Sequence, residues 1–94
     1  MIRSPDFFAA MIDAKLEIRT FIVEHFLFGQ AAGLADDTSF LEQAVIDSTG
    51  VLELVAHLEA TYGIKVNDDE LIPDNLDSIH SVAAFVQKKL HPTV

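Results

Sequence analysis

The sequence predicts an all-α protein: a four-helix bundle with three longer helices, one short helix, and a long loop between the first two helices. Three observations lead to this prediction. Apolar residues recur at helical spacing in three separate stretches of the 94-residue chain. Capping residues and glycines mark the ends of those stretches. The one alternating run, Ile64-Lys65-Val66, is too short for a strand and has no partner strand, so we expect an extended connector there.

The first helix is expected from about Pro5 to Phe28. Ser4 and Pro5 suit a helix start, because serine caps the first turn and proline fits the first helical position. Gly29 suits a left-handed stop. The stripe between these ends is apolar except for Arg19: Phe8, Met11, Ile12, Leu16, Arg19, Ile22, Val23 and Phe26. Two aromatic groups at the helix ends are expected in the core, with a partner surface as the alternative: Phe7-Phe8 and Phe26-Leu27-Phe28.

The segment from Gly29 to Asp47 has no sustained period and is predicted to be a long loop. A loop of that length usually has its own packing or a function. A short helical turn around Phe40–Gln43 is compatible with this segment. Its large apolar side chains are predicted to hold it against the bundle: Phe40, Leu41, Val45 and Ile46.

The second helix is predicted from Ser48 to Tyr62, with Asp47 at the N-cap and Gly63 just past the end. Gly50 lies in the first turn, where glycine lowers helix propensity, and such local inconsistencies are places to look for function. The inner stripe is Val51, Leu54, Val55, Leu58 and Tyr62. A second row is spaced by three or four residues and therefore shares one outward face: Thr49, Leu52, Glu53, Ala56 and Ala60.

Short turns and a final helix complete the predicted bundle. Asn67–Leu71 is expected to form a short turn, and Pro73–Leu76 another turn or a mini-helix. Asp77 is expected to cap the last helix, and Pro92 prevents its continuation. The apolar stripe of that helix is Ile79, Val82, Ala83, Val86 and Leu90.

The amino-acid composition and net charge limit the classes of function that fit this chain. Half of the residues are hydrophobic, and we expect one folded domain over residues 1–94. There is no cysteine for a disulfide or a thiolate metal site. The formal charge of −9 argues against nucleic acid and suits a partner with a basic docking patch. No apolar run approaches membrane-spanning length, so we expect a cytoplasmic protein without membrane insertion.

The start of the second helix is the candidate site. Ser48 offers a small, mobile hydroxyl beside unpaired backbone N–H groups and the positive end of the helix dipole, which favours a phosphate. An Asp-Ser pair alone is an ordinary helix start. The pair recurs at Asp77-Ser78, where too little chain follows for a second recognition helix. We therefore expect Ser78 to be a plain cap.

From Asp37 onward the chain resembles the acyl or peptidyl carrier protein family, on Ile46-Asp47-Ser48, Glu53-Leu54 and Leu58–Ile64. In that family the serine of the Asp-Ser pair carries a 4′-phosphopantetheine arm taken from coenzyme A. The resemblance therefore implies that Ser48 carries the arm, and that Asp47 helps to orient the substrate and cations of the modifying enzyme. It also implies a four-helix bundle. Of the candidate docking residues, the outward face supplies Thr49, Leu52 and Ala56, and the resemblance implies Glu53 and Glu59. A solvated face is the alternative for Glu59.

The resemblance implies a discrete carrier that is not an enzyme. Its partners would be a phosphopantetheinyl transferase, an acyl- or amino-acid-activating ligase, and downstream transferases with basic docking patches. The cargo, held as a thioester, stays open between an acyl group and an amino acid. Thr49-Gly50 differs from the leucine of many fatty-acid carriers, and with Gly50 leaving room beside the arm it favours an amino acid. An acyl chain would favour an apolar slot beneath the second helix, built from Val51, Val55, Leu58 and Ile64.

Catalysis or metal binding by the chain itself finds little support. The histidines lack the i, i+4 spacing of a helical metal site and are expected at the surface: His25, His57, His80 and His91. His57 follows Ser48 by nine residues on the same helix, about 15 Å along the axis, which is too far for it to act as a base. The alternative function is a non-carrier acidic helical adaptor that binds a basic protein partner.

Overall fold

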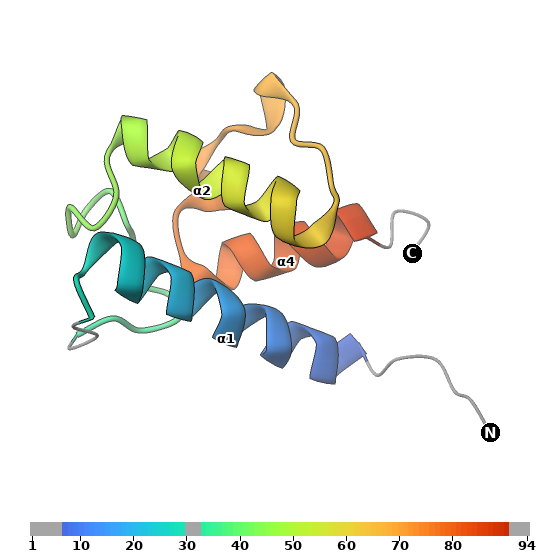
Figure 1. Cartoon of the computed structure of the whole chain (residues 1–94), viewed down its shortest axis with the longest axis horizontal. Coiled ribbons are helices and arrows are strands. Elements are labelled where there is room, and N and C mark those ends of the chain that lie inside the picture. The colour runs from blue at the N-terminus through green and yellow to red at the C-terminus, as the bar shows by residue number, and fades with distance from the viewer. Residues whose placement is uncertain (1–6, 30–32, 91–94) are drawn as a thin grey trace.

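The computed structural model describes residues 7–29 and 33–90, and within them it contains only helices, turns and loops (Figure 1). The long helices are α1 (Phe7–Phe26), α2 (Ser48–Tyr62) and α4 (Ile79–Leu90). A 3₁₀ turn, η1 (Asp68–Glu70), and a one-turn helix, α3 (Pro73–Leu76), connect α2 to α4. The prediction of an all-α bundle with three longer helices, one short helix and a long first loop is confirmed. No helix in the described part is both long and apolar enough to cross a membrane.

The core lies where the three long helices meet the connection between α1 and α2. α1 packs most extensively on α4, and α2 also contacts α4. Burial of each large aliphatic side chain stabilises the fold by roughly 1.5–3 kcal/mol. The largest fully buried side chains come from all four segments: Ile18, Ile22, Phe40, Ile46, Leu54, Leu58, Ile79, Val82 and Val86. The predicted inner stripes of α2 and α4 therefore hold the bundle together, although Leu90 at the end of the last stripe is exposed. The predicted stripe of α1 is partly wrong, because Ile12 and Leu16 are exposed and Ile18, which lies outside that stripe, is fully buried.

The first helix ends earlier than predicted. α1 ends at Phe26 instead of Phe28. The chain already turns left-handed at Phe28, where φ is 55°, and continues so at Gly29. The Gly29 N–H then donates to the Val23 carbonyl at 2.9 Å. Phe28 is 89% exposed, so its predicted place in the core is wrong, whereas Phe26 and Leu27 pack against the core.

Several predicted features of the two ends of the chain lie outside what the structure describes. They are the Ser4 cap, Pro5, the side chains of Phe7 and Phe8, His91, and Pro92.

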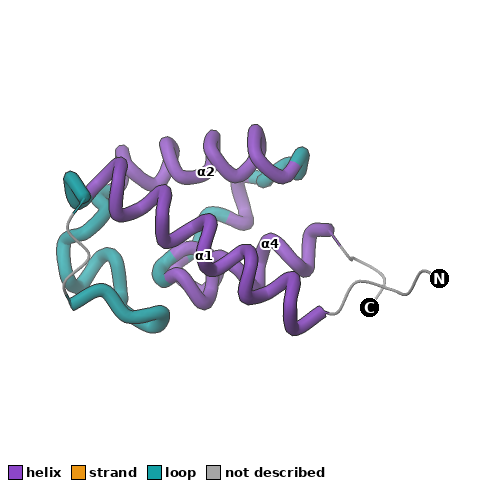
Figure 2. Tube along the Cα trace, turned by 60° about the horizontal axis from the view of Figure 1, so that its bottom comes forward, coloured by secondary structure: helices purple, strands orange, loops and turns teal. Residues whose placement is uncertain are grey.

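The connection between α1 and α2 gathers at one end of the helices (Figure 2). Phe40 and Ile46 are buried in the core and Val45 packs against it, as predicted, but Leu41 is 51% exposed. The segment after Ser39 forms hydrogen-bonded turns, and the Gln43 N–H donates to the Ser39 carbonyl at 3.1 Å, as in a single helical turn. The Val45 N–H donates to the Phe40 carbonyl at 2.8 Å, which closes the loop on itself. Two buried anchors, Phe40 and Ile46, thus hold the segment that leads into α2.

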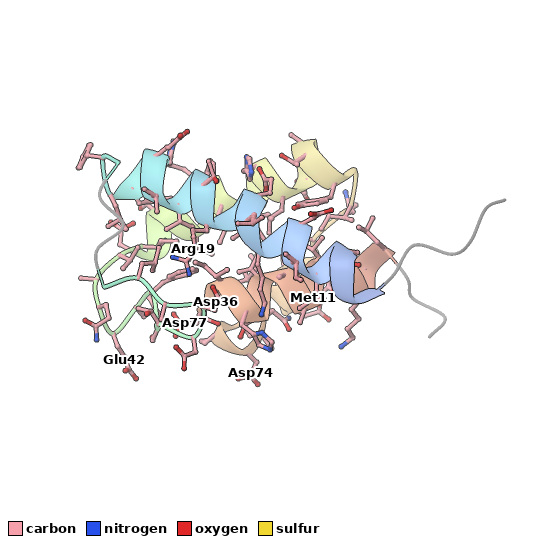
Figure 3. All side chains as sticks on the ribbon, turned by 90° about the horizontal axis from the view of Figure 1, so that it is seen from below. Met11, Arg19, Asp36, Glu42, Asp74 and Asp77 are labelled. Atoms are coloured by element: carbon pink, nitrogen blue, oxygen red, sulfur yellow. The ribbon has the colours of Figure 1, made fainter. Side chains whose placement is uncertain are left out.

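Arg19, the one polar residue in the apolar stripe of α1, fastens this connection to α1. Its guanidinium donates to the Leu34 carbonyl and to Asp36 Oδ1, both at 2.6 Å. Figure 3 shows Arg19 and Asp36 side by side between α1 and the connection. The Arg19 hydrogen bond, with smaller effects from Lys15, holds the pKa of Asp36 below its ordinary value of 3.8. The Asp36 carbonyl in turn accepts the His80 N–H at 2.8 Å, so the connection also meets the start of α4.

The predicted cap of the last helix is wrong by one residue. Ser78, not Asp77, caps α4, because Ser78 Oγ accepts the Ser81 N–H at 3.0 Å. The carboxylate of Asp77 accepts hydrogen bonds from Ser39 Oγ and, at 2.9 Å, from the Leu41 N–H. Asp77 therefore fixes the connection, and Ser78 is the plain cap that the sequence predicts.

The segment after α2 is held at both ends. Gly63 adopts the predicted left-handed conformation (φ 69°), and its N–H donates to the Glu59 carbonyl at 3.0 Å. Further along, Glu70 accepts the Asn67 N–H at 2.9 Å and pairs with Lys89 of α4 at 2.8 Å. The Asn67 N–H and then the Lys89 ammonium lower the pKa of Glu70. These bonds place η1 against the C-terminal half of α4.

Candidate functional site

The site begins at the N-terminus of α2. Ser48 is the first helical residue and is exposed. Asp47 is the N-cap in an extended conformation, and its Oδ1 accepts the Gly50 N–H at 2.7 Å. The Asp47 carbonyl accepts the Val51 N–H at 3.0 Å, which starts the helical ladder. Because Asp47 fills the cap position, the hydroxyl of Ser48 is left for other chemistry at the positive end of the helix.

Gly50 has a different role from the predicted one. It is buried, and a methyl group at this position would lie 2.8 Å from Ile46 Cγ2 and 2.9 Å from Phe26 Cε1. The expectation that Gly50 leaves room beside a prosthetic arm is therefore wrong. Glycine is required because the end of α1 and the connection approach the first turn of α2 closely here. The sequence does show a glycine in the first turn of a helix, and the close packing of Ile46 and Phe26 explains why it is there.

An apolar groove of about 280 Å³ runs beside Ser48. Its size is near the lower end of the range for small-molecule sites. It lies between the first turns of α2, the connection, and the segment from Leu71 to Asp77. Apart from Ser48 and Asp77 its lining is apolar: Phe40, Leu41, Ile46, Val51, Leu52, Leu71, Ile72, Pro73 and Leu76.

The apolar slot predicted beneath α2 is thus wrong in three of its four residues. Val51 lines the groove, but Val55, Leu58 and Ile64 do not. Leu58 is fully buried in the core, where it packs against other side chains and does not line the groove. The groove is displaced toward the N-terminus of α2 because the connection and α3 supply its other walls, and these walls come from segments distant in sequence.

The predicted outward face of α2 is present. Thr49, Leu52, Glu53, Ala56 and Ala60 are all exposed, and Leu52 is 59% exposed despite being a large apolar residue. Glu59 lies at the edge of this row and is half-buried, and its Oε2 accepts the Val66 N–H at 2.9 Å. The carboxylate of Glu59 therefore holds the segment after α2.

A seam of aromatic and acidic side chains joins α1 to α2. His25 Nε2 lies 2.5 Å from Glu53 Oε1, and His57 Nε2 lies 2.7 Å from Glu17 Oε2. Phe21 stacks between the two histidine rings, with centroid distances of 4.9 Å to His25 and 3.8 Å to His57. Each helix thus supplies one histidine and one carboxylate to the other.

Tyr62 belongs to the same seam. Its hydroxyl donates to Glu17 Oε1 at 3.3 Å. Burial, and then the neighbouring Glu17 carboxylate, raise the pKa of Tyr62 to about 12. Glu17 therefore binds two groups of α2, the His57 ring and the Tyr62 hydroxyl, and fixes the C-terminal half of α2 against α1.

These contacts between α1 and α2 were not predicted from the sequence. His57 was expected at the surface, but its side chain is only 22% exposed. The available signal was the i, i+4 spacing of Glu17, Phe21 and His25 on one helix and of Glu53 and His57 on the next. Within residues 7–29 and 33–90, no three histidine or acidic side chains come together as a metal site.

Comparison with known proteins identifies the family. Residues 27–86, more than half of the chain, match the family described as the phosphopantetheine attachment site. The chain is 42% identical over 62 residues to the anthracycline acyl carrier protein DauA of Streptomyces sp. (strain C5), covering 65% of this chain and 71% of that protein. It is 31% identical over 83 residues to the probable acyl carrier protein PigG of Serratia sp. (strain ATCC 39006), covering 87% and 93%.

A third relative is the anthracycline acyl carrier protein DpsG of Streptomyces peucetius, 43% identical over 58 residues, covering 61% of this chain and 67% of that protein. The matched region contains α2, the groove beside it, and the Asp47-Ser48 pair. The chain therefore belongs to the phosphopantetheine-binding family of acyl carrier proteins, which hold their cargo on a covalently attached 4′-phosphopantetheine group and are not themselves enzymes.

Proposed function

We propose that Ser48 is the residue to which 4′-phosphopantetheine is attached, and that the protein presents an acyl group on this arm to partner enzymes. The observation that carries the proposal is the exposed hydroxyl of Ser48 at the first position of α2, beside an apolar groove. These residues fit a phosphate-linked group: the hydroxyl is accessible, it is not used as the cap, and it lies at the positive end of a fifteen-residue helix. The arm supplies a terminal thiol that holds the cargo as a thioester.

In the loading step, a phosphopantetheinyl transferase brings coenzyme A to Ser48. The Ser48 oxygen forms a bond to the phosphorus that carries the pantetheine part, and the bond from that phosphorus to the pyrophosphate bridge oxygen breaks. Adenosine bisphosphate leaves with the electron pair, and the hydroxyl proton passes to a base of the transferase. Asp47 uses Oδ1 for the cap, and we assign its second oxygen to the cations that accompany coenzyme A.

An acyl cargo is favoured by the chemistry of the groove. The groove is apolar over nearly all of its lining, and Ser48 is one of its lining residues, so an arm attached there starts at the groove. The relatives DauA, PigG and DpsG are named acyl carrier proteins. One of the two physical arguments for an amino acid was free space at Gly50, and that space is filled by Ile46 and Phe26. The other, threonine in place of leucine at position 49, still stands. An aminoacyl cargo is therefore the second candidate.

Partner docking is assigned to the outward face of α2. Leu52 offers an exposed apolar side chain next to the groove, and Glu53 offers a carboxylate on the same face. A partner with a hydrophobic recess and basic residues would match both, and the charge of −9 would steer its approach. The proposed partners are the transferase, an acyl-activating ligase and downstream transferases. A cytoplasmic location remains part of this proposal.

The experiment is incubation of the protein with coenzyme A and a broad-specificity phosphopantetheinyl transferase, followed by intact-mass measurement. We expect one phosphopantetheine per chain in the wild type and none in Ser48→Ala. Ser78→Ala is the matched control, because it removes the serine of the other Asp-Ser pair, and it should load like the wild type. A wild type that stays unloaded would remove the carrier proposal and leave the acidic adaptor, whereas loading of Ser48→Ala would move the site elsewhere. Activating ligases for acyl and amino acids, applied to the loaded protein, then separate the two cargoes.

A further inference from the structure

We propose that His25 determines which partners can use Glu53, because the His25 ring occupies the carboxylate that α2 would offer to a basic partner. This inference rests on the proposed function and concerns its docking step. A partner that binds Glu53 has to displace the His25 ring first, so His25 acts as an internal competitor for the partner's lysine or arginine.

The geometry places the competitor directly on the docking face. His25 belongs to the last turn of α1 and reaches across to Glu53 of α2, with 2.5 Å between Nε2 and Oε1. The two side chains are 46% and 52% exposed, so a partner can reach both. Glu53 lies on the side of α2 that faces α1, roughly 140° around the helix from Ser48 at 100° per residue. The docking face is thus bordered by the groove at one edge and by His25 at the other.

The His25 ring is held in place by its aromatic neighbours. It stacks on Phe21 with an interplanar angle of 14°, and it meets Phe26 edge-on at a centroid distance of 4.8 Å. Aromatic packing of this kind reduces the freedom that the side chain would lose on pairing. His25 therefore competes as a positioned group, whereas a partner's flexible lysine has to lose side-chain entropy on binding Glu53.

The size of the effect follows from the exposure of the pair. Exposed ion pairs are weak, and displacing one changes an affinity by about two- to five-fold. A change of this size alters the carrier's preference among partners more than the fraction of carrier that is bound. A partner with a single lysine opposite Glu53 loses about the full two- to five-fold in affinity. A partner arginine that binds the carboxylate with two hydrogen bonds offsets this loss of affinity.

The second pair in the seam provides the control. His57 stacks on the opposite side of Phe21 and pairs with Glu17, which belongs to α1 and not to the docking face. Substituting His57 disturbs the same seam but leaves the Glu53–His25 pair intact. An effect that arises from general loosening of α1 against α2 would appear in both histidine variants, whereas competition for Glu53 would appear in one.

The test is the Michaelis constant (KM) of the broad-specificity phosphopantetheinyl transferase for the carrier, at saturating coenzyme A. His25→Phe retains the stack on Phe21 and removes the hydrogen-bond donor, so KM for the carrier should fall about two- to five-fold with kcat unchanged. His25→Leu is a second variant, also without a donor, in case the larger ring disturbs folding, and thermal unfolding checks both. His57→Phe should leave KM unchanged.

The same substitution in a Glu53→Gln background provides the decisive comparison. There His25→Phe should change nothing, because the carboxylate for which His25 competes is gone. An unchanged KM in His25→Phe and His25→Leu, a fall that persists without Glu53, or an equal fall in His57→Phe would each overturn the inference. Failure of the proposed function gives a different result, since the wild type would then gain no phosphopantetheine mass at all.

Discussion

Two helices of this protein begin with the same dipeptide, Asp-Ser, and use it in opposite ways. At α2, Asp47 is the cap and Ser48 follows it, so the hydroxyl of Ser48 stays exposed. At α4 the helix begins one residue later relative to the pair. Ser78 is itself the cap, only 9% exposed and bonded to the Ser81 N–H, and Asp77 is turned to the connection. A shift of one residue converts a free hydroxyl into a structural one.

The cause of the shift lies in the segments that precede each pair. Asp47 follows Ile46, a buried anchor of the connection, and within residues 7–29 and 33–90 no other hydrogen bond to its carboxylate competes with the cap bond from the Gly50 N–H. Asp77 ends α3, and its carboxylate accepts from Ser39 and Leu41, so the cap falls to the next residue. Tertiary contacts, more than the dipeptide, decide which serine is available for modification.

The largest expected effect concerns the third residue after each cap, Gly50 at α2 and Ser81 at α4. Gly50→Ala should lower the free energy of unfolding by about 1–3 kcal/mol, because the added methyl group overlaps Ile46 and Phe26 and this outweighs alanine's better helix propensity. For a chain of this size the unfolding midpoint should fall by about 4–8 °C per kcal/mol. Ser81→Ala at the matching position should shift it much less. Equal midpoints for Gly50→Ala and the wild type would contradict the close approach.

A smaller effect distinguishes the two serines themselves. Ser78→Ala removes a helix cap and should cost about 1 kcal/mol of stability. Ser48→Ala removes an exposed hydroxyl that caps nothing, so its cost should stay within about 0.5 kcal/mol. Urea unfolding of both variants measures the difference. If Ser48→Ala were the more damaging of the two, the assignment of caps at α2 would be incorrect.

The smallest expected effect is on folding stability at low pH, through the carboxyl group of Asp36 near the start of α4. Asp36, whose carbonyl accepts the His80 N–H, has a pKa held below 3.8 by Arg19. A carboxyl group with a lowered folded-state pKa adds stability above its unfolded pKa and loses it as pH falls through the folded value. Stability should therefore decline below about pH 4, and Asp36→Asn should flatten this part of the curve. The control is Asp37→Asn, at a neighbouring exposed carboxylate that forms no salt bridge with the residues that the structure describes. An Asp36→Asn curve as steep as that of the wild type would argue against this source.

The features that could be predicted from sequence are those fixed by local rules. The bounds of α2, the Asp47 cap and the Gly63 stop follow from cap chemistry and periodicity, and the structure places all three as expected. The exposed face of α2 follows from the same periodicity. Arg19 was visible as the polar exception in an apolar stripe, but nothing local to it indicated that it binds Asp36 of the connection.

The remaining features depend on segments that meet only in the folded chain. The groove needs walls from the connection and from α3, so the sequence predicted a slot in the wrong place. The role of Gly50 depends on Phe26, which lies twenty-four residues away. The His25–Glu53 and His57–Glu17 pairs join two helices whose relative rotation no periodicity specifies. The positions of the candidate site residues on α2 were predictable, and their surroundings in the folded chain were not.

Asp77 has a consequence for the capacity of the groove. Its carbonyl accepts the Phe40 N–H and its carboxylate accepts the Leu41 N–H, so one residue ties together two walls that line the same apolar space. The floor between those walls cannot widen unless these bonds break. If the groove holds the proposed acyl cargo, the added length of a longer tail would therefore lie at the mouth, where Leu41, Leu52 and Ile72 already face solvent.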